Sequence, residues 1–213
     1  MFPAMLRLDG VDTLVVGGGP VAARRAAALA ENGAKVSVVA PSACEAMRRL
    51  VASEGVVWQE RGFERGDVDG KRVVVAATDT PATNIIIADA ARSSGAWVNV
   101  ADDASHGDLH FPATARRGRM TVAISTDGVS PLVSRRIREG ILDEYGDEFA
   151  QLLDLLADTR EEARASLSTQ PARKRFYEAV LDSDIGSTLK AGNPRAARER
   201  VAELLDRHAG RQA

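Results

Sequence analysis

The sequence contains one cysteine, Cys44, among 213 residues. A single thiol cannot form a disulfide within the chain, and no Cys and His residues stand at the spacing of a zinc motif. We therefore expect a protein of the reducing cytoplasm that holds neither a disulfide nor a metal ion.

Long apolar runs and an excess of one charge are also missing. No stretch reaches the roughly 20 apolar residues that a membrane-spanning helix needs, and the opening MFPAMLRLDG lacks the features of an export signal. The formal net charge of −2 gives no general attraction to nucleic acid or to an anionic membrane. We expect neither a nucleic-acid partner nor membrane association.

Up to residue 102, short β-branched runs alternate with alanine-rich helical segments. Strands are predicted at 12–16, 35–39, 56–59, 72–78 and 96–100, and helices at 20–32, 42–53 and 81–93. This alternation is typical of an α/β fold with a parallel sheet that is covered by helices on both faces.

The pattern changes in the second half of the chain. LHFPATARRGRMTVAIST forms two extended runs around Arg117-Gly118, which predicts an antiparallel pair, and Ser130-Pro131 opens the first of several helices. We expect a first domain at 1–113, a small antiparallel and helical segment at 114–145, and a C-terminal helical domain at 146–213.

A glycine-rich loop follows the first predicted strand. In VVGGGPVAARRA, Gly17 permits a tight turn, Gly19 lets the backbone approach a pyrophosphate, and Ala22 permits close packing of the helix on the sheet. The N-terminus of the following helix offers unpaired N–H groups to phosphates. This context favours a Rossmann-like dinucleotide site over a glycine-rich turn without a ligand.

The second predicted strand ends at Val39 and is followed by Pro41-Ser42, without an acidic residue for the ribose and without an arginine for a 2′-phosphate. The residues alone leave NAD and NADP open, with Ser42 or backbone groups to hold the ribose. Thr78 and Asp79 follow another strand at the same edge of the sheet. They are candidate cofactor contacts, and they could equally cap the helix that Pro81 opens.

Several ionisable residues directly follow the last apolar strand of this half, in the stretch VNVADDASHGDLHFPA. Asn99 and Asp102 stand at the carboxyl end of this strand, on the same edge as the glycine loop. Asn99 is a candidate cofactor contact, and Asp102 is the best candidate for a general base beside a nicotinamide. Four further ionisable residues follow, and they are typical of a solvated loop: Asp103, His106, Asp108 and His110. The two histidines share no helical face on which they could bind a metal ion together.

Residues 114–140 hold an excess of arginine. Two acidic residues stand against six basic ones, Arg116, Arg117, Arg119, Arg135, Arg136 and Arg138. This excess suits either a multiply carboxylated ligand or a solvated helix face and oligomer rim. Candidate substrate contacts are Arg116 and Arg135, with hydroxyls from Ser125 and Ser130.

Four stretches resemble the siroheme-synthase N-terminal family in their order and spacing: VVGGGPVAARRAAALAENGAKVSVVAPS, VVVAATDTPATN, VNVADDASHGDLHFPA and MTVAISTDGVSPLVSRRIRE. The resemblance implies a precorrin-2 dehydrogenase of siroheme biosynthesis, in which NAD⁺ oxidises precorrin-2 to sirohydrochlorin. Some members are also sirohydrochlorin ferrochelatases that take Fe²⁺ as a substrate. It also implies a homodimer whose dimerisation segment is 114–145.

The family's essential carboxylate falls on Asp102, as base in the oxidation and as acceptor of pyrrole protons in chelation. Its NAD contacts fall on Pro20-Val21 and Pro41-Ser42, and a further hydroxyl near the substrate falls on Thr126.

The sequence departs from the family at Asp127, where relatives often carry glycine, and Asp103 and His106 match no family signature. We expect precorrin-2 to come from a separate enzyme, because 213 residues leave no room for the methyltransferase that some members carry. Two alternatives stay open: an NAD(H)-sensing Rossmann module without catalysis, and a chelatase alone.

Overall fold

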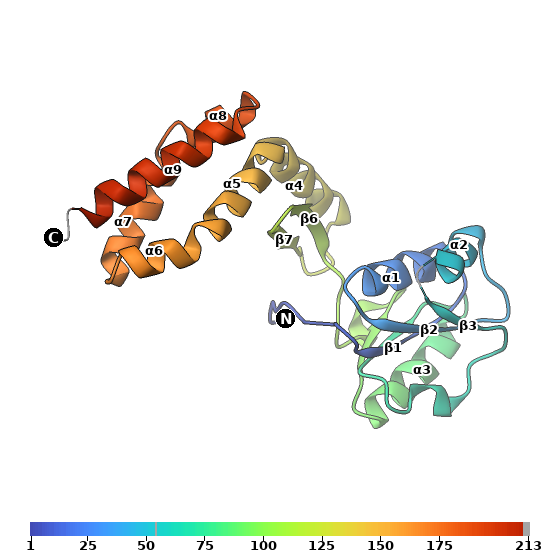
Figure 1. Cartoon of the computed structure of the whole chain (residues 1–213). Coiled ribbons are helices and arrows are strands. Elements are labelled where there is room, and N and C mark those ends of the chain that lie inside the picture. Colours follow the sequence, from blue (N-terminus) through green and yellow to red (C-terminus); the bar gives the residue numbers. More distant parts are fainter. Residues whose placement is uncertain (54, 211–213) are drawn as a thin grey trace. The chain divides into compact units, whose positions relative to one another are not determined.

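The computed structural model describes residues 1–53 and 55–210 (Figure 1). The chain divides into two compact units, Met1–Phe111 and Pro112–Ala213. No helix in the described part of the chain is long and apolar enough to cross a membrane.

The first unit is built on a five-stranded parallel sheet in the order β3-β2-β1-β4-β5. The strands are β1 Asp12–Val16, β2 Lys35–Val39, β3 Val57–Gln59, β4 Val73–Ala76 and β5 Trp97–Val100. The helices are α1 Pro20–Ala30, α2 Glu45–Ser53 and α3 Pro81–Ser93, with short 3₁₀ turns η1 Arg65–Val68 and η2 Ala104–His106. The predicted α/β fold with a Rossmann-like parallel sheet is confirmed.

Helices cover both faces of this sheet. Figure 1 shows α1 and α2 on one face and α3 on the other. Side chains of a strand point alternately to opposite faces, so Val15 and Val75 pack with α1, whereas Val16 and Val74 pack with α3. Because both faces are buried, the strands are almost continuously apolar.

The strand order reverses between β1 and β4, and ligands of such sheets bind where this happens, at the carboxyl ends of the strands. The helix predicted at 42–53 begins only at Glu45. Residues before it wrap against the glycine loop, where Cys44 N donates to Gly18 O at 2.8 Å. This contact keeps residues 42–44 out of the helix.

The second unit begins with an antiparallel pair, β6 Ala113–Arg117 and β7 Met120–Ile124, whose register pairs Arg117 with Met120. The predicted hairpin is confirmed, and its turn places Gly118 at φ +54°. The helices are α4 Pro131–Glu144, α5 Asp147–Asp158, α6 Arg160–Ser166, α7 Gln170–Leu181, α8 Ile185–Lys190 and α9 Pro194–Ala209.

The core of this unit gathers around Phe176, which is fully buried among residues of α5 to α9. The first helix, α4, stands apart from this core: among its residues only Ser134 is buried. The predicted division of this unit between residues 145 and 146 stays a prediction.

Candidate active site

A cleft of about 840 Å³ opens at the carboxyl edge of the first unit's sheet. We call it the dinucleotide cleft. The loops that follow β1, β2, β4 and β5 supply most of its lining: Gly17 to Val21, Ala40 to Cys44, Ala77 to Thr80, and Ala101-Asp102. The fold therefore brings together four loops that carry predicted site residues, at one edge of the sheet.

The three glycines of the loop after β1 have different surroundings. Gly17 has φ +126°, and a Cβ there would lie 2.2 Å from Ala77 O. A Cβ on Gly18 would lie 1.8 Å from Ser42 O, so this residue, which the motif leaves unspecified, must also be glycine. At Gly19 a Cβ would meet no heavy atom within 4 Å among the residues described. Gly17 and Gly18 are thus needed for packing, and Gly19 leaves open space for a ligand.

The helix after this loop presents its N-terminus to the cleft. Gly19 is the N-cap of α1, with no side-chain cap, and Pro20 is the first helical residue. Pro20 and Val21 line the cleft, and the first N–H groups of a helix have no acceptor within it. Since Ala22 is fully buried, the helix lies close on the sheet. An anion in front of Gly19 would meet these N–H groups and the positive end of the helix dipole.

The loop after β2 supplies Pro41 and Ser42 to the cleft wall. The indole of Trp58 donates to Ala40 O at 3.0 Å and holds this loop in place. Over residues 1–53 and 55–210, no arginine or lysine lines the cleft, and its acidic residues are Asp79 and Asp102.

Asn84 links two of the predicted site residues. Its side chain is 1% exposed, and its Oδ1 accepts hydrogen bonds from Thr78 N (3.0 Å) and Thr78 Oγ1 (2.7 Å). Its Nδ2 donates to Thr78 O (3.2 Å) and to Asp102 Oδ1 (2.9 Å). The amide therefore fixes the exposed Asp102 carboxylate relative to the loop after β4.

Sequence reasoning missed Asn84. The available signal was an amide within the first turn of a helix that is otherwise alanine- and isoleucine-rich. A buried amide must satisfy its hydrogen bonds within the protein, and the acceptor that it needs comes from a loop 18 residues away in the chain.

Asn99 lies on β5 and is 5% exposed, and it is not among the residues that line the cleft. Its Nδ2 donates to Leu109 O at 2.8 Å, which ties the loop after β5 back onto the sheet. Its buried Oδ1 has no hydrogen-bond partner among the described residues. A cofactor contact by Asn99 stays a prediction.

The ionisable residues after Asp102 hold their own loop together. Asp103 accepts from Ser105 Oγ at 2.6 Å and Ser105 N at 2.9 Å, and its Oδ2 lies 2.8 Å from His106 Nδ1. The hydrogen bond from the Ser105 hydroxyl, followed by that from His106, lowers the pKa of Asp103 to about 2. Arg92 of α3 binds both His106 O and Asp108. These groups explain the charged sequence as a loop-closing network beside the cleft.

The hydroxyls predicted to contact substrate lie together in the second unit. Thr126 Oγ1 donates to Ser130 O and accepts from Ser130 N, both at 3.1 Å, and it lies 3.2 Å from Ser134 Oγ. Ser125 Oγ accepts from Asp127 N at 3.2 Å. These contacts close the turn between β7 and α4.

Asp127 has φ +54°, in the left-handed region. Glycine adopts this region without strain, and aspartate is one of the residues that tolerate it. The departure from glycine at this position is therefore compatible with the turn.

The predicted arginines are divided between several roles. Arg116 lies on β6, and Arg135 on α4 forms an ion pair with Glu139 at 2.9 Å. Arg117 donates to Tyr145 O and Leu142 O and pairs with Asp147, so it braces the junction of α4 and α5. Contacts of Arg116 and Arg135 with a substrate stay predictions.

Three family models match the chain. A model described as "Putative NAD(P)-binding" matches residues 4–113. "Sirohaem biosynthesis protein central" matches 117–143, and "Sirohaem synthase dimerisation region" matches 148–205.

Siroheme synthases are similar over most of this chain. The protein from Methylococcus capsulatus is 37% identical over 205 residues, which are 96% of this chain and 43% of the relative. That from Thioalkalivibrio sulfidiphilus is 33% identical, over 96% of this chain and 42% of the relative. The chain thus spans less than half the length of these curated relatives.

A solved structure titled "SirC, precorrin-2 dehydrogenase" superposes on this chain with a TM-score of 0.78 at 27% sequence identity. The superposition covers 95% of this chain and 100% of the other.

Proposed function

The chain belongs to the NAD(P)-binding family of sirohaem biosynthesis proteins, and from this premise we propose that it is an NAD-dependent precorrin-2 dehydrogenase. The observation that carries the proposal is the Asp102 carboxylate, held by Asn84 at the edge of a cleft that begins at a glycine loop and a helix N-terminus.

The cleft fits a dinucleotide. The space in front of Gly19, the first N–H groups of α1 and the wall formed by Pro41-Ser42 would hold the pyrophosphate and a ribose. Bound NAD⁺ supplies the hydride acceptor. Asp102 accepts the proton that leaves precorrin-2 as its conjugation extends, so that sirohydrochlorin, NADH and a proton are formed.

We propose NAD rather than NADP as the cofactor. A 2′-phosphate is generally neutralised by an arginine near the end of the second strand, and no cation of the described residues lines the dinucleotide cleft. The cleft's own acidic residues, Asp79 and Asp102, would also repel that phosphate.

We propose that the protein acts as a homodimer. The match to a sirohaem synthase dimerisation region at 148–205 supports this, as does α4. Leu132, Val133 and Ile137 of α4 are between 45% and 66% exposed, and Val129 before it is 86% exposed. Apolar side chains gathered on one helix are typical of a surface that a partner covers. The segment that makes the contact, 114–145 or 148–205, stays a prediction, as does the cytoplasmic location.

An anaerobic assay tests the proposal. Precorrin-2 generated enzymatically is supplied with NAD⁺, and the absorbance of NADH and of sirohydrochlorin are followed together. Equal amounts of both products are expected. Measurable NAD⁺ binding without turnover would instead support an NAD(H)-sensing module. In a second arm of the assay, Fe²⁺ is added as a substrate and its insertion into sirohydrochlorin is followed by absorbance. This ferrochelatase activity stays a prediction.

Asp102→Asn is the first variant for this assay. We expect it to bind NAD⁺ and to lose on the order of a hundredfold or more in turnover, because the amide cannot accept the proton. The matched control is Asp103→Asn, since the neighbouring carboxylate faces Ser105 and His106 and lies outside the cleft lining. Equal activity of the two variants would refute the role of Asp102.

A further inference from the structure

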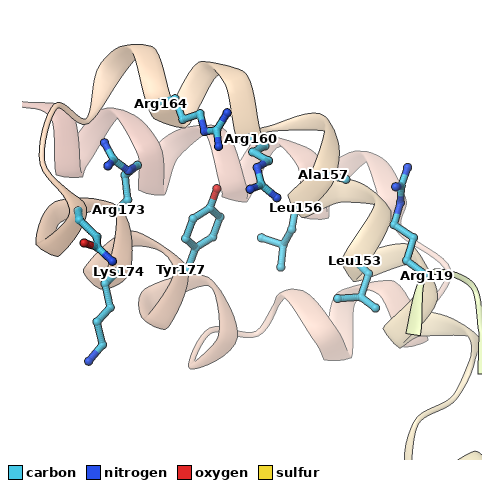
Figure 2. Close-up of a pocket in the computed structure, with 10 residues that line it drawn as sticks. Arg119, Leu153, Leu156, Ala157, Arg160, Arg164, Arg173, Lys174 and Tyr177 are labelled. Carbon is cyan, nitrogen blue, oxygen red and sulfur yellow. The ribbon is translucent and has the colours of Figure 1, made fainter. Parts of the chain in front are cut away.

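The second unit contains a hollow of about 740 Å³ between α5, α6, α7 and the turn of the β6–β7 hairpin (Figure 2). We call it the α5–α7 hollow. Ten residues line it: Arg119, Leu153, Leu156, Ala157, Arg160, Arg164, Gln170, Arg173, Lys174 and Tyr177. None of the dinucleotide cleft's residues is among them.

The charge of this lining has one sign. Five of its ten residues are arginine or lysine, and within the described chain no aspartate or glutamate is part of it. Three of the cations reach carboxylates outside the lining: Arg119 to Asp154, Arg164 to Glu161 and Lys174 to Glu178.

Arg160 and Arg173 form no ion pair with any residue that the structure describes, although Arg173 donates to Leu167 O at 2.7 Å. The lining therefore concentrates five cations in a chain with a net charge of −2, and two of them, Arg160 and Arg173, have no carboxylate partner among the described residues. Such a concentration attracts a ligand with several negative charges.

The floor of the hollow is apolar. Leu153, Leu156 and Ala157 come from α5, and the half-buried ring of Tyr177 comes from α7. Figure 2 shows Tyr177, Arg160 and Arg164 pointing toward the same space, while Lys174 extends outward at the rim. The Tyr177 hydroxyl has no hydrogen-bond partner in residues 1–53 and 55–210.

We infer that the α5–α7 hollow is a binding site for a multiply carboxylated small molecule with a flat apolar body. Arginine forks bind carboxylates through paired hydrogen bonds, and the tyrosine hydroxyl can donate one more. The apolar floor covers the body of the ligand. The volume lies within the few hundred to about 1,000 Å³ of small-molecule sites.

Within this ligand class, a carboxylated tetrapyrrole is the member that the protein would meet, and this identification rests on the proposed function. The dinucleotide cleft and the α5–α7 hollow differ in the groups that line them. The dinucleotide cleft offers backbone N–H groups and no described cation, whereas the α5–α7 hollow offers arginines around an apolar floor. The hollow is therefore a tetrapyrrole site in addition to the place where Asp102 reacts.

The test is binding of uroporphyrin, an air-stable tetrapyrrole with eight carboxylates, to the full chain without NAD⁺, followed by fluorescence. The variant is Arg160→Gln with Arg164→Gln, which removes the two guanidinium groups that α6 contributes to the lining. We expect its Kd to rise on the order of tenfold or more, because charge-assisted hydrogen bonds are lost. Wild-type binding should also weaken as salt is added.

The matched control is Arg195→Gln with Arg198→Gln, which removes the same charge from exposed positions of α9 in the same unit. We expect this control to bind as the wild type does. Tyr177→Phe gives a milder second variant, which keeps the ring and removes the hydroxyl.

Unchanged binding in the Arg160/Arg164 variant overturns the inference, as does uroporphyrin binding that NAD⁺ displaces. Dissociation of the dimer by this variant in sedimentation also overturns it, because the hollow would then be an interface between two copies. The proposed function is tested independently of this site. If the wild type binds uroporphyrin through these arginines but does not oxidise precorrin-2, the binding site is supported and the dehydrogenase activity is refuted.

Discussion

At the scale of single residues, Asn84 shows how one buried amide connects the loop after β4 to the Asp102 carboxylate. Its two acceptor contacts and one donor contact belong to Thr78, and its remaining donor contact belongs to Asp102. We regard it as a positioning residue, since it is 1% exposed and acts through Asp102.

Two Asn84 variants separate positioning from folding. Asn84→Ala leaves Thr78 without its partners, which should cost about 1–3 kcal/mol of unfolding free energy, and should lower kcat on the order of ten- to a hundredfold. Asn84→Asp can keep the Thr78 donors paired but places a second carboxylate against Asp102. Like charges raise the pKa of a carboxyl group, so the acid limb of the pH–rate profile should move to higher pH. An unmoved profile with normal kcat would show that Asn84 is only structural.

Gly18 and Gly19 make a second pair of contrasting residues. A Cβ on Gly18 would lie 1.8 Å from a backbone oxygen, whereas one on Gly19 would meet nothing within 4 Å in the described chain. Gly18→Ala should therefore destabilise the protein by about 1–3 kcal/mol through overpacking. Gly19→Ala should cost less than about 1 kcal/mol, and it should weaken NAD⁺ binding because the methyl group enters the open cleft. Urea denaturation and calorimetry measure the two effects, and equal stability of the two variants would contradict this assignment.

At the scale of elements, α4 is the helix whose apolar side chains lack cover within the chain described. Only Ser134 of its 14 residues is buried, and Leu132 and Ile137 are 66% and 45% exposed. The neighbouring β6–β7 pair has two strands, and an isolated pair is marginal unless something packs on it. Both features are consistent with dimerisation through 114–145.

Charge on α4 tests this. Leu132→Asp with Ile137→Asp should shift the protein from dimer to monomer in sedimentation, because burying unpaired carboxylates in an interface is costly. The matched control is Leu181→Asp, an exposed leucine of α7 within the matched dimerisation region. If Leu181→Asp dissociates the dimer and the α4 variant does not, the contact lies in 148–205 and the prediction for 114–145 is wrong.

At the scale of the whole molecule, the dinucleotide cleft belongs to the first unit alone. All residues that line the dinucleotide cleft lie between Val16 and Asp102, within the unit that ends at Phe111. The two apolar clusters of that unit contain residues of that unit alone. We therefore expect nucleotide binding to need the first unit only.

A fragment of residues 1–111 should fold cooperatively and bind NAD⁺ with a Kd within about tenfold of the full chain. It should not oxidise precorrin-2, because the candidate substrate contacts Arg116, Ser125, Thr126, Ser130 and Arg135 belong to the second unit. Circular dichroism and calorimetry, followed by the anaerobic assay, check this. Turnover by the fragment would remove those residues from substrate binding.

Local patterns in the sequence determined the α/β alternation, the glycine loop, the hairpin turn at Gly118 and the cap of α4 at Ser130. Each depends on residues close in the chain, whose spacing follows from the geometry of strands, helices and turns. Asp102 could be chosen in the same way, because the carboxyl ends of parallel strands meet at one edge of the sheet.

Only the tertiary structure decided which distant residues touch. The contact of Asn84 with Asp102, the close approach of Gly18 to Ser42 and the gathering of arginines around Tyr177 each join segments from different elements. Their charges and sizes are visible in the sequence, but their distances depend on strand order and helix packing, which periodicity does not encode. The same holds for the charged residues after Asp102. That they hold their own loop together follows only from the contacts of Asp103 with Ser105 and His106 in the structure.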